Sequence, residues 1–385
     1  MTGLQPEHGT GTSTRPLSSR ALVLTGPRSL EMRDLPVPEP SDDGALLRVE
    51  ACGLCGTDHE LFTGHLPART PMVPGHETIG VLEEVGPELA GRWGVTVGDR
   101  VAVECFRSCG TCDPCATGTY RRCTSHGLRT AYGLSPLDVE PELSGGWADH
   151  HWLAADSMLI PVPDDIDPVD ATLFNPIGAG IRWGVDLPAT GPGDVVVVLG
   201  PGIRGLAAAA AAREAGAGFV MVTGLGEWDH PRLEAATDFG VDLAVDVADT
   251  DPVAALRAAT GGLRADVVVD VTANAPAALG QAVDLAAIGG RIVLAGTRNS
   301  TDTPGFVPDL IVFKELTLIG ALGVDAPVYR RALDLLASDR YPFRSVPRTV
   351  APLSGAADLL ATMAGEGEGP PPVHAVIVPR ADELR

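Results

Sequence analysis

The stretch that decides the fold class is DVVVVLGPGIRGLAAAAAAREAGA, at residues 194–217. Its apolar run is typical of a strand buried on both faces, and its alanine-rich half is typical of a helix. Between them lies Gly200-Pro-Gly202-Ile-Arg-Gly205. Glycines in this context permit a tight turn, close approach of the backbone to a pyrophosphate and close packing of helix on strand. The stretch therefore predicts a dinucleotide-binding turn at a helix N-terminus. A turn whose glycines serve only chain reversal is the alternative.

The expected cofactor contacts continue into the next strand, GFVMVTG. A dinucleotide fold usually places an acidic residue on the ribose about 20 residues after the glycine motif. Here the strand ends at Gly224 instead, which favours NADP within a general expectation of NAD(P). A carboxylate that folds back from Glu227 or Asp229 is the alternative. The candidate cofactor-binding residues are Gly200, Gly202, Ile203, Arg204, Gly205, Thr223, Gly224 and Arg232.

On both sides of this motif the sequence pattern of the chain changes. Further apolar strands, ADVVVDV and GGRIVLAG, alternate with helical patterns, which implies a parallel sheet covered on both faces. Earlier runs such as RALVL and GALLRVEACG are broken by Gly and Pro, as in an irregular antiparallel barrel-like domain. Near the C-terminus, HAVIVP is expected to rejoin that first domain as a strand. We predict an α/β chain with a flexible tail (1–20), a β-rich domain (21–170 and 340–385) and a Rossmann doubly wound parallel sheet domain (171–339).

Four of the seven cysteines lie close together in CGTCDPCATGTYRRC, at Cys109, Cys112, Cys115 and Cys123. Disulfides seldom persist in a reducing cytosol, where short-spaced cysteine pairs usually hold a metal or do redox work. Four thiolates suit a tetrahedral zinc ion and leave no open position for a substrate. The loop therefore predicts a structural zinc site. A redox Cys-x-x-Cys pair and an iron–sulfur cluster are the alternatives.

Composition and charge limit the partners. The chain has 385 residues, of which 45% are hydrophobic, and this is typical of a folded globular protein. Its net charge of −22 argues against nucleic acid and anionic membrane as partners, because binding to phosphates needs a basic face. The N-terminal residues lack the apolar core of a signal peptide, and no run approaches the roughly 18 apolar residues of a membrane span. We expect a cytoplasmic chain.

Two further motifs lie in the β-rich part, Gly53-Leu-Cys55-Gly-Thr57-Asp58 and Pro74-Gly75-His76-Glu77. With the cysteine loop, the GPGIRG turn and the late VFKELTLIGALG, they make a chain that resembles the zinc-dependent medium-chain dehydrogenase/reductase family from about residue 20 to residue 379. The resemblance implies a GroES-like catalytic domain for the β-rich part and a substrate cleft beside the Rossmann domain. It assigns the four-cysteine loop to a structural zinc.

The same resemblance assigns roles around a catalytic zinc. It makes Cys55 and His76 zinc ligands and Glu77 a neighbouring carboxylate that can coordinate the ion. Thr57 matches the hydroxyl that relays the alcohol proton, and Asp58 matches a supporting acid. These roles agree with the chemistry, because hydride leaves a carbinol carbon readily only as its oxygen becomes an alkoxide, and zinc lowers the pKa of a bound alcohol.

Three positions depart from the family pattern. Asn175 stands where the family usually offers Cys or Glu to the catalytic zinc, so either Glu77 binds the metal while Asn175 holds a water, or the Asn175 amide oxygen is a ligand. Glu60 stands where the family often has a His that passes protons outward. Arg204 replaces an aliphatic residue behind the nicotinamide. A cation there either disfavours the oxidised, positively charged ring or reaches a phosphate, and an arginine solvated on the helix surface is the alternative.

The resemblance implies a zinc-dependent oxidoreductase that transfers a hydride between NAD(P) and a secondary alcohol, polyol or sugar, or the corresponding ketone. We expect a small-molecule alcohol or ketone substrate, two zinc ions per chain and a homodimer or homotetramer. One alternative is a zinc-free reductase of conjugated enones in the same superfamily. Another is a non-catalytic nucleotide-sensing protein, which would not need to keep the CGTD and GHE motifs.

Overall fold

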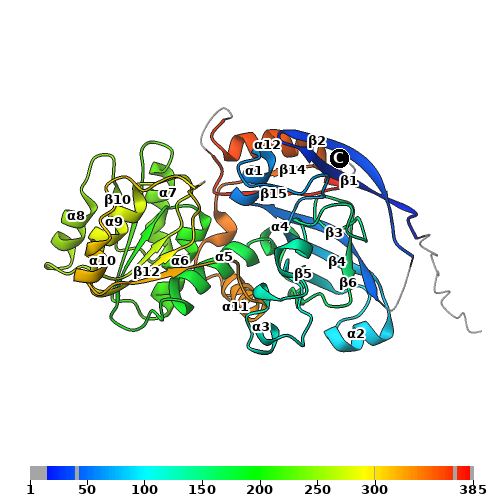
Figure 1. The fold of residues 1–385 in the computed structure, drawn as a ribbon, viewed down its shortest axis with the longest axis horizontal. Coiled ribbons are helices and arrows are strands. Elements are labelled where there is room, and N and C mark those ends of the chain that lie inside the picture. The colour runs from blue at the N-terminus through cyan, green and yellow to red at the C-terminus, as the bar shows by residue number, and fades with distance from the viewer. Residues whose placement is uncertain (1–14, 40–42, 299, 367–370, 382–385) are drawn as a thin grey trace, which may run out of the picture.

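Two large sheets, one parallel and one mostly antiparallel, organise the computed structural model of the chain (Figure 1). The structure describes residues 15–39, 43–298, 300–366 and 371–381. The sheets lie at opposite ends of the long axis, and helices α5 and α11 lie between them. This arrangement confirms the predicted fold class, a GroES-like β-rich part beside a Rossmann sheet.

The parallel sheet has six strands in the order β10-β9-β8-β11-β12-β13, and every neighbouring pair is parallel. The strand order reverses between β8 and β11, and ligands of such sheets bind at the carboxyl ends of the strands at this switch point. The predicted glycine turn directly follows β8, so it lies at the switch point. The strands are β8 (Val195–Leu199), β9 (Phe219–Gly224), β10 (Leu243–Asp246), β11 (Ala265–Asp270), β12 (Ala286–Leu294) and β13 (Thr317–Gly320).

Helices cover both faces of this sheet. Alanines 207–212 of α6 are buried, and their small side chains let α5 approach closely: a Cβ added to Gly180 would lie 2.4 Å from the Ala207 backbone. The helices and helical turns of this part are α5 (Phe174–Ile181), the π-helical turn η3 (Arg182–Asp186), α6 (Ile203–Glu214), α7 (His230–Ala235), η4 (Ala236–Phe239), α8 (Pro252–Ala259), α9 (Ala278–Leu285), α10 (Asp309–Phe313) and α11 (Ala326–Ala337).

The second sheet has the order β14-β15-β3-β4-β5-β7, and β6 also pairs with β3. Its antiparallel register places Gly53 opposite Glu77, so the two predicted ligand motifs meet at one end of neighbouring strands. The strands are β3 (Gly44–Leu54), β4 (Glu77–Val85), β5 (Arg100–Val103), β6 (His150–Ala154), β7 (Leu159–Pro161), β14 (Arg348–Ala351) and β15 (His374–Ile377). Strand β15 lies antiparallel beside β3, which confirms that HAVIVP rejoins the first part of the chain.

Smaller elements complete this part of the molecule. The hairpin of β1 and β2 lies outside the seven-stranded sheet. The elements are β1 (Ser18–Gly26), β2 (Ser29–Pro36), α1 (Gly56–Thr63), α2 (Pro87–Trp93), α3 (Asp113–Ala116), η1 (Tyr120–Arg122), η2 (Gly127–Thr130), α4 (Pro168–Ala171), η5 (Phe343–Ser345), η6 (Leu353–Gly355) and α12 (Ala356–Met363).

The predicted tail of residues 1–20 is too long at its C-terminal end. Residues 1–14 lie outside the described residues, but Ser18 already begins β1 and pairs with Pro36. Side-chain contacts fix this start: the Ser19 hydroxyl accepts a hydrogen bond from the His150 amide, and Arg20 pairs with Asp149. Because these contacts are polar and reach a strand far along the chain, they produce no hydrophobic pattern from which the start of β1 could have been predicted. The boundaries near residues 170 and 340 stay a prediction.

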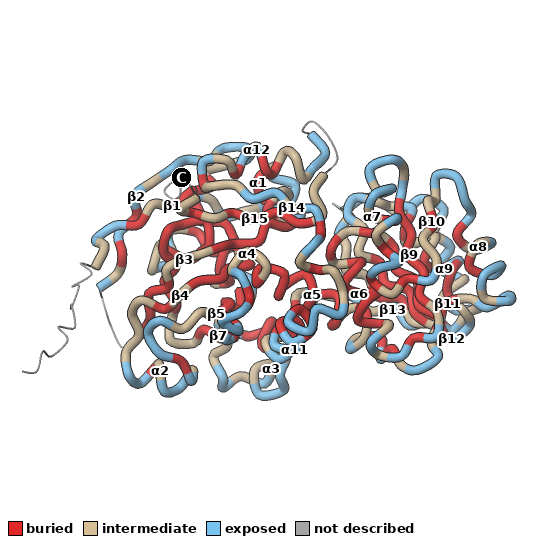
Figure 2. The backbone as a smooth tube through the Cα atoms, turned by 180° about the vertical axis from the view of Figure 1, so that it is seen from behind, coloured by how far each residue is buried: buried red, intermediate tan, exposed pale blue. Residues whose placement is uncertain are grey.

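The buried core continues from one sheet to the other (Figure 2). One cluster of buried side chains includes Ile79 of the second sheet, Phe174 of α5, Tyr329 of α11 and Val198 of the parallel sheet. The junction between the two parts is therefore held by apolar packing around α5 and α11. Among the described residues, no helix combines the length and the apolar character that crossing a membrane would need.

Candidate active site

The four-cysteine loop forms a closed donor set. The four Sγ atoms lie within 4.8 Å of one another, with 3.9 Å between Cys109 and Cys115 and between Cys112 and Cys123. Four sulfurs about 2.3 Å from a tetrahedral zinc ion lie roughly 3.8 Å apart, whereas a disulfide needs about 2.05 Å. Backbone hydrogen bonds from Thr111 and Cys112 lower the pKa of the Cys109 thiol to about 5. The loop therefore fits a zinc ion.

The second donor set joins the two ligand motifs. The ligand atoms of Cys55, His76 and Glu77 lie within 4.8 Å of one another, and the Cys55 Sγ is 3.3 Å from the His76 Nε2. Cys55 is the N-cap of α1, and its Sγ accepts a hydrogen bond from the Thr57 amide at 3.3 Å. Among the described residues, these two sets are the groups whose side chains could share a metal ion.

Asp58 supports this set from the first turn of α1. One carboxylate oxygen accepts a hydrogen bond from the Cys55 amide at 2.9 Å, which completes a capping box. The other lies 3.6 Å from the His76 Nδ1, and both atoms are buried without a hydrogen-bond partner. A metal on Nε2 fixes the ring proton on Nδ1, where it can be donated to Asp58. The unpartnered Asp58 Oδ1 and His76 Nδ1 thus fit a metal ion bound at Nε2, on the opposite side of the His76 ring.

Burial and charge compete over the ionisation of these ligands. Burial disfavours the charged His76 ring, but Cys55 and Asp58 outweigh it and raise its pKa well above the ordinary value. Burial also raises the pKa of Glu77, and the nearby Arg204 guanidinium partly offsets this rise. A site that gathers several acidic groups out of water needs a cation to balance them.

Arg204 supplies such a cation from the glycine turn. Its Nη2 lies 2.6 Å from the Glu77 Oε1 and 3.0 Å from the Asn175 Oδ1. Its side chain is 24% exposed and bonded to both residues, so the alternative of an arginine solvated on the helix surface is wrong. Because a guanidinium only donates, the Asn175 atom that faces it is the carbonyl oxygen. The other end of this amide donates to the Tyr329 hydroxyl at 3.0 Å.

Tyr329 is a site residue that no motif or spacing in the sequence marks. It lies on α11, 154 positions from Asn175, and only 2% of it is exposed. A buried tyrosine usually finds a hydrogen-bond partner, and this general rule is the only signal that would have marked it. Its ring also packs edge-on against Phe174, 4.7 Å between centroids.

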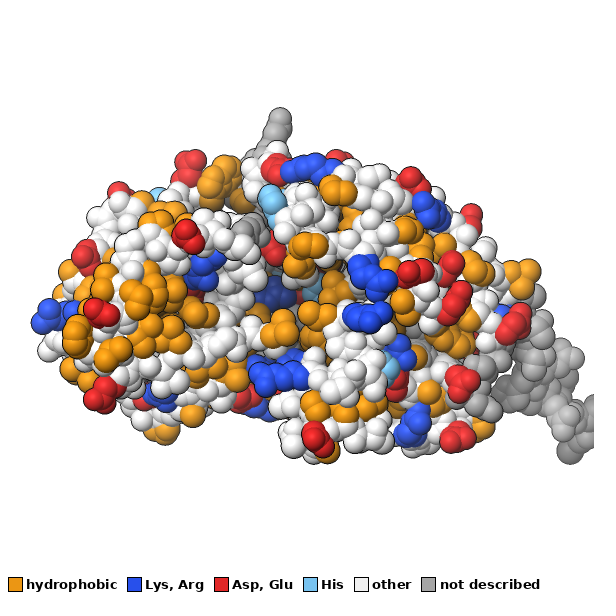
Figure 3. Space-filling model, in the orientation of Figure 1, with side chains coloured by type: hydrophobic (Ala, Val, Ile, Leu, Met, Phe, Trp, Pro, Cys, Tyr) orange, Lys and Arg blue, Asp and Glu red, His pale blue; other side chains and the backbone are white. Residues whose placement is uncertain are grey.

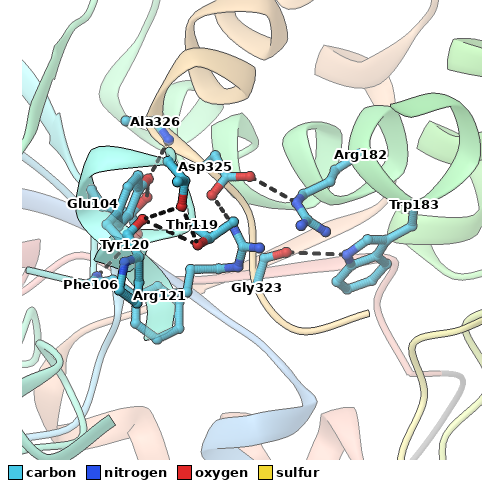
Figure 4. Close-up of polar contacts among 12 residues, drawn as sticks. Glu104, Phe106, Thr119, Tyr120, Arg121, Arg182, Trp183, Gly323, Asp325 and Ala326 are labelled. Carbon is cyan, nitrogen blue, oxygen red and sulfur yellow. Dashed lines mark hydrogen bonds and ion pairs between the residues drawn. The ribbon is translucent and has the colours of Figure 1, made fainter. Parts of the chain in front are cut away.

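A polar network fixes the start of α11 against the cysteine loop (Figure 4). The Tyr120 hydroxyl, three residues before Cys123, donates to the Glu104 carboxylate and accepts from the Ala326 amide, both at 2.5 Å. Arg121 and Arg182 both pair with Asp325, the N-cap of α11. The cysteine loop thereby helps to place the helix that carries Tyr329.

The glycine turn fits a dinucleotide. A Cβ on Gly205 would lie 1.9 Å from the Gly200 carbonyl oxygen, so the turn requires glycine there. A Cβ on Gly202 would meet nothing within 4 Å, and Gly202 caps α6 without a side-chain hydrogen bond. Open space thus lies before the free N–H groups of a twelve-residue helix, as a pyrophosphate needs. Ile203 is the first residue of that helix and is buried.

At the end of β9, Thr223 is buried and Gly224 ends the strand. The carboxylate of Asp229 does fold back: it accepts a hydrogen bond from the Leu225 amide at 2.9 Å. It also pairs with Arg232 at 3.1 Å, so its charge is matched. Glu227 is exposed.

The structure therefore brings the predicted metal ligands and the predicted dinucleotide-binding turn together. A space-filling view shows a hollow between the two halves of the molecule, with basic and histidine side chains inside it (Figure 3). Thr57 is half-buried beside Cys55. Glu60, in the position of the family's outward proton carrier, accepts a hydrogen bond from the Thr297 hydroxyl at 3.0 Å, across the two halves.

Comparisons with known proteins agree with this geometry. Residues 41–164 match the model of an alcohol dehydrogenase GroES-like domain, and residues 205–338 match that of a zinc-binding dehydrogenase. The chain therefore belongs to the zinc-type medium-chain dehydrogenase family, and within it is an NAD(P)-dependent alcohol dehydrogenase.

Particular relatives span nearly the whole chain. A probable alcohol dehydrogenase of Mycobacterium tuberculosis is 62% identical, over 94% of this chain and 98% of its own length. A sorbitol dehydrogenase of Bacillus subtilis is 30% identical, over 85% of this chain and 88% of its own. Among solved structures, a putative zinc-binding dehydrogenase from Sinorhizobium meliloti bound to NADP has a TM-score of 0.77 at 28% identity, covering 94% of this chain and 99% of its own.

Proposed function

We propose that this enzyme interconverts a secondary alcohol, polyol or sugar and the corresponding ketone with a catalytic zinc held by Cys55, His76 and Glu77. A second zinc, held by the four-cysteine loop, is structural. The observation that carries the proposal is the contact of Arg204 with Glu77. This contact joins the glycine turn to the donor set and so supports the proposal, because hydride transfer requires cofactor and substrate to meet.

Each residue of the site then has a task. A bound zinc ion supplies Lewis acidity, which favours the deprotonated form of the alcohol from which hydride departs. The Thr57 hydroxyl, two residues after Cys55 and partly exposed, would accept a hydrogen bond from the alcohol and relay its proton onward to solvent water. Asp58 orients the His76 ring. Asn175 faces Arg204 and Tyr329 rather than water, so it supports the site without carrying charge.

Metal analysis and two cysteine substitutions test this proposal. We expect two zinc ions per folded chain. Cys55→Ser should lose one zinc and nearly all turnover while it still folds and binds dinucleotide, because a catalytic zinc contributes mainly to chemistry. Cys112→Ser should lose the other zinc and lower the stability of the protein.

Two results would refute the assignment. One zinc per folded wild-type chain would remove the catalytic ion. Near-normal turnover by Cys55→Ser would favour the zinc-free reduction of a conjugated enone, in which the cofactor alone supplies the hydride.

We also propose that NADP(H) serves at least as well as NAD(H). Gly224 offers no carboxylate to repel a 2′-phosphate, and Asp229 is already paired with Arg232. Arg232, whose Nη atoms donate to Asp229 and to the carbonyl oxygens of Pro371 and Pro372, would have to exchange one of these contacts for the phosphate. Charge-assisted hydrogen bonds, at about 1.5–3 kcal/mol each, favour that exchange.

The pair Asp229 and Arg232 allows a matched test. Arg232→Gln should weaken NADP(H) binding by roughly tenfold or more and leave NAD(H) binding little changed. Asp229→Asn should leave NADP(H) binding unchanged or tighter. Equal losses of both cofactors in Arg232→Gln, measured by fluorescence titration, would contradict the proposal and indicate damage to the loop.

A further inference from the structure

The Arg204 guanidinium links two sites that belong to different parts of the chain. Its backbone lies in the turn between Gly200 and Gly205, and its Nη2 lies 2.6 Å from Glu77, 127 positions away. The Glu77 side chain is only 2% exposed. A close ion pair this deeply buried is not a surface contact, because each charge has lost most of its water.

The same guanidinium decides how Asn175 is oriented. It donates a hydrogen bond to the Asn175 Oδ1 at 3.0 Å, and the Asn175 Nδ2 donates one to the Tyr329 hydroxyl. The amide oxygen, which is the only Asn175 atom suited to bind a cation, is therefore already engaged. Glu77 is left as the third protein ligand beside Cys55 and His76.

Glu77 itself has little freedom to turn away from Arg204. Its Oε1 accepts from the guanidinium, and its Oε2 lies against Gly53, where an added Cβ would come within 2.4 Å. A carboxylate in this slot must share its negative charge between the guanidinium and a metal held by Cys55 and His76. The guanidinium therefore weakens the binding of the carboxylate to the metal, and the metal weakens its binding to the guanidinium.

We propose that Arg204 is a positioning residue that competes with the catalytic metal for the Glu77 carboxylate and so keeps that metal loosely held and electrophilic. This inference rests on the proposed function, because it needs a zinc ion at Cys55, His76 and Glu77. It gives the dinucleotide turn a task besides binding the cofactor. A residue of the turn sets the charge that the metal receives from its third ligand.

The rate of zinc release to an excess of a chromogenic chelator tests the proposal. Protein loaded with two zinc ions per chain should release them in two phases, and Cys55→Ser, which lacks the catalytic ion, identifies the phase of the four-cysteine site. In Arg204→Met the carboxylate is left to the metal alone, so the catalytic phase should slow at least tenfold. The four-cysteine phase should not change, which makes it an internal control.

Two further variants separate competition from other roles. Arg204→Lys keeps the charge and should release zinc within about threefold of the wild-type rate. In a Glu77→Gln background, Arg204 and the metal have no carboxylate to compete for. Arg204→Met should therefore change the rate of release of the catalytic zinc much less than in the wild-type background.

The outcomes distinguish the inference from the function on which it rests. If wild-type protein holds two zinc ions and Arg204→Met releases the catalytic one as fast as wild type or faster, the inference fails and the proposed function stands. The inference also fails if Arg204→Met slows release equally in both backgrounds, because simple repulsion between cations would then explain the effect. If wild-type protein holds only one zinc, both fail.

Discussion

Gly202 and Gly205 belong to one turn but need to be glycine for different reasons. Gly205 lies against the Gly200 carbonyl, where an added Cβ would be only 1.9 Å away. Gly202 faces open space and has a φ of −67°, which any residue adopts. One glycine is therefore required by the fold, and the other is required only if something binds in that space.

This difference makes a prediction. Gly205→Ala should lower the denaturation midpoint, because the turn must open to admit the methyl group. Gly202→Ala should keep the wild-type midpoint and yet weaken dinucleotide binding by about tenfold or more, because its methyl group occupies the space before the α6 N-terminus. Calorimetric titration with NADP together with denaturant unfolding measures both effects. Unchanged binding by Gly202→Ala would place the pyrophosphate elsewhere.

What the sequence predicts at this scale is what lies close together along the chain. The glycine turn and the four cysteines each fall within a short segment, so spacing alone was enough to predict them. The direction of the Arg204 side chain depends on Glu77 and Asn175, which reach it only through the fold. Tyr329 was missed for the same reason, since its partner lies on another helix.

At the scale of elements, the cysteine loop and α11 meet around a buried carboxylate. Burial raises the pKa of Glu104 to about 7, above its ordinary value of 4.5, although the Tyr120 hydroxyl and the Phe106 amide donate to it. The folded protein therefore binds this proton more tightly than the unfolded chain does. The resulting stabilisation is fully present below pH 4.5 and is lost as the pH rises through 7.

A single substitution isolates this contribution. Glu104→Gln keeps an oxygen that can accept from Tyr120 but removes the ionisation. Between pH 6 and pH 8 the wild-type protein should lose roughly 1 kcal/mol more unfolding free energy than Glu104→Gln does, because burial raises the pKa of Glu104 from 4.5 to about 7. Denaturant unfolding of zinc-loaded protein at both pH values measures the difference. Parallel pH profiles of the two proteins would show that Glu104 is ionised throughout.

Elements were predicted well where the pattern is local and less well where contacts are distant. The valine-rich run before the glycine turn and the alanine-rich helix after it are in the structure as expected. The start of β1 at Ser18 was missed because its anchors, His150 and Asp149, lie far along the chain.

At the scale of the whole molecule, β13 is an edge strand with apolar surroundings. Within the described part of the chain it pairs only with β12, and Leu318 within it is 36% exposed. Phe313 just before it is 74% exposed, and Leu322 just after it is 56% exposed. An exposed apolar edge favours pairing with another strand. A second copy of this chain offers the same edge, and a twofold axis would join the two sheets.

We therefore predict a dimer through β13, which is also the unit from which a tetramer would be built. Leu318→Lys should shift the mass measured by analytical ultracentrifugation from a multiple of the chain to a single chain, because like charges would then face each other across the axis. Leu263→Lys is the matched control, since Leu263 is 56% exposed but lies before β11, away from this edge. An oligomer that survives Leu318→Lys would place the interface on another surface.

The position of β15 has a consequence for the synthesis of the chain. This strand pairs with β3, which carries the Cys55 motif at its end, and it leaves the ribosome only after every strand of the parallel sheet. The parallel sheet is complete well before then and can fold while synthesis continues. Until β15 emerges, Cys52, Gly53 and Leu54 of β3 lack a partner on one edge, so the metal-binding half of the enzyme is completed later than the parallel sheet. A nascent chain stalled before residue 374 would expose that edge to aggregation.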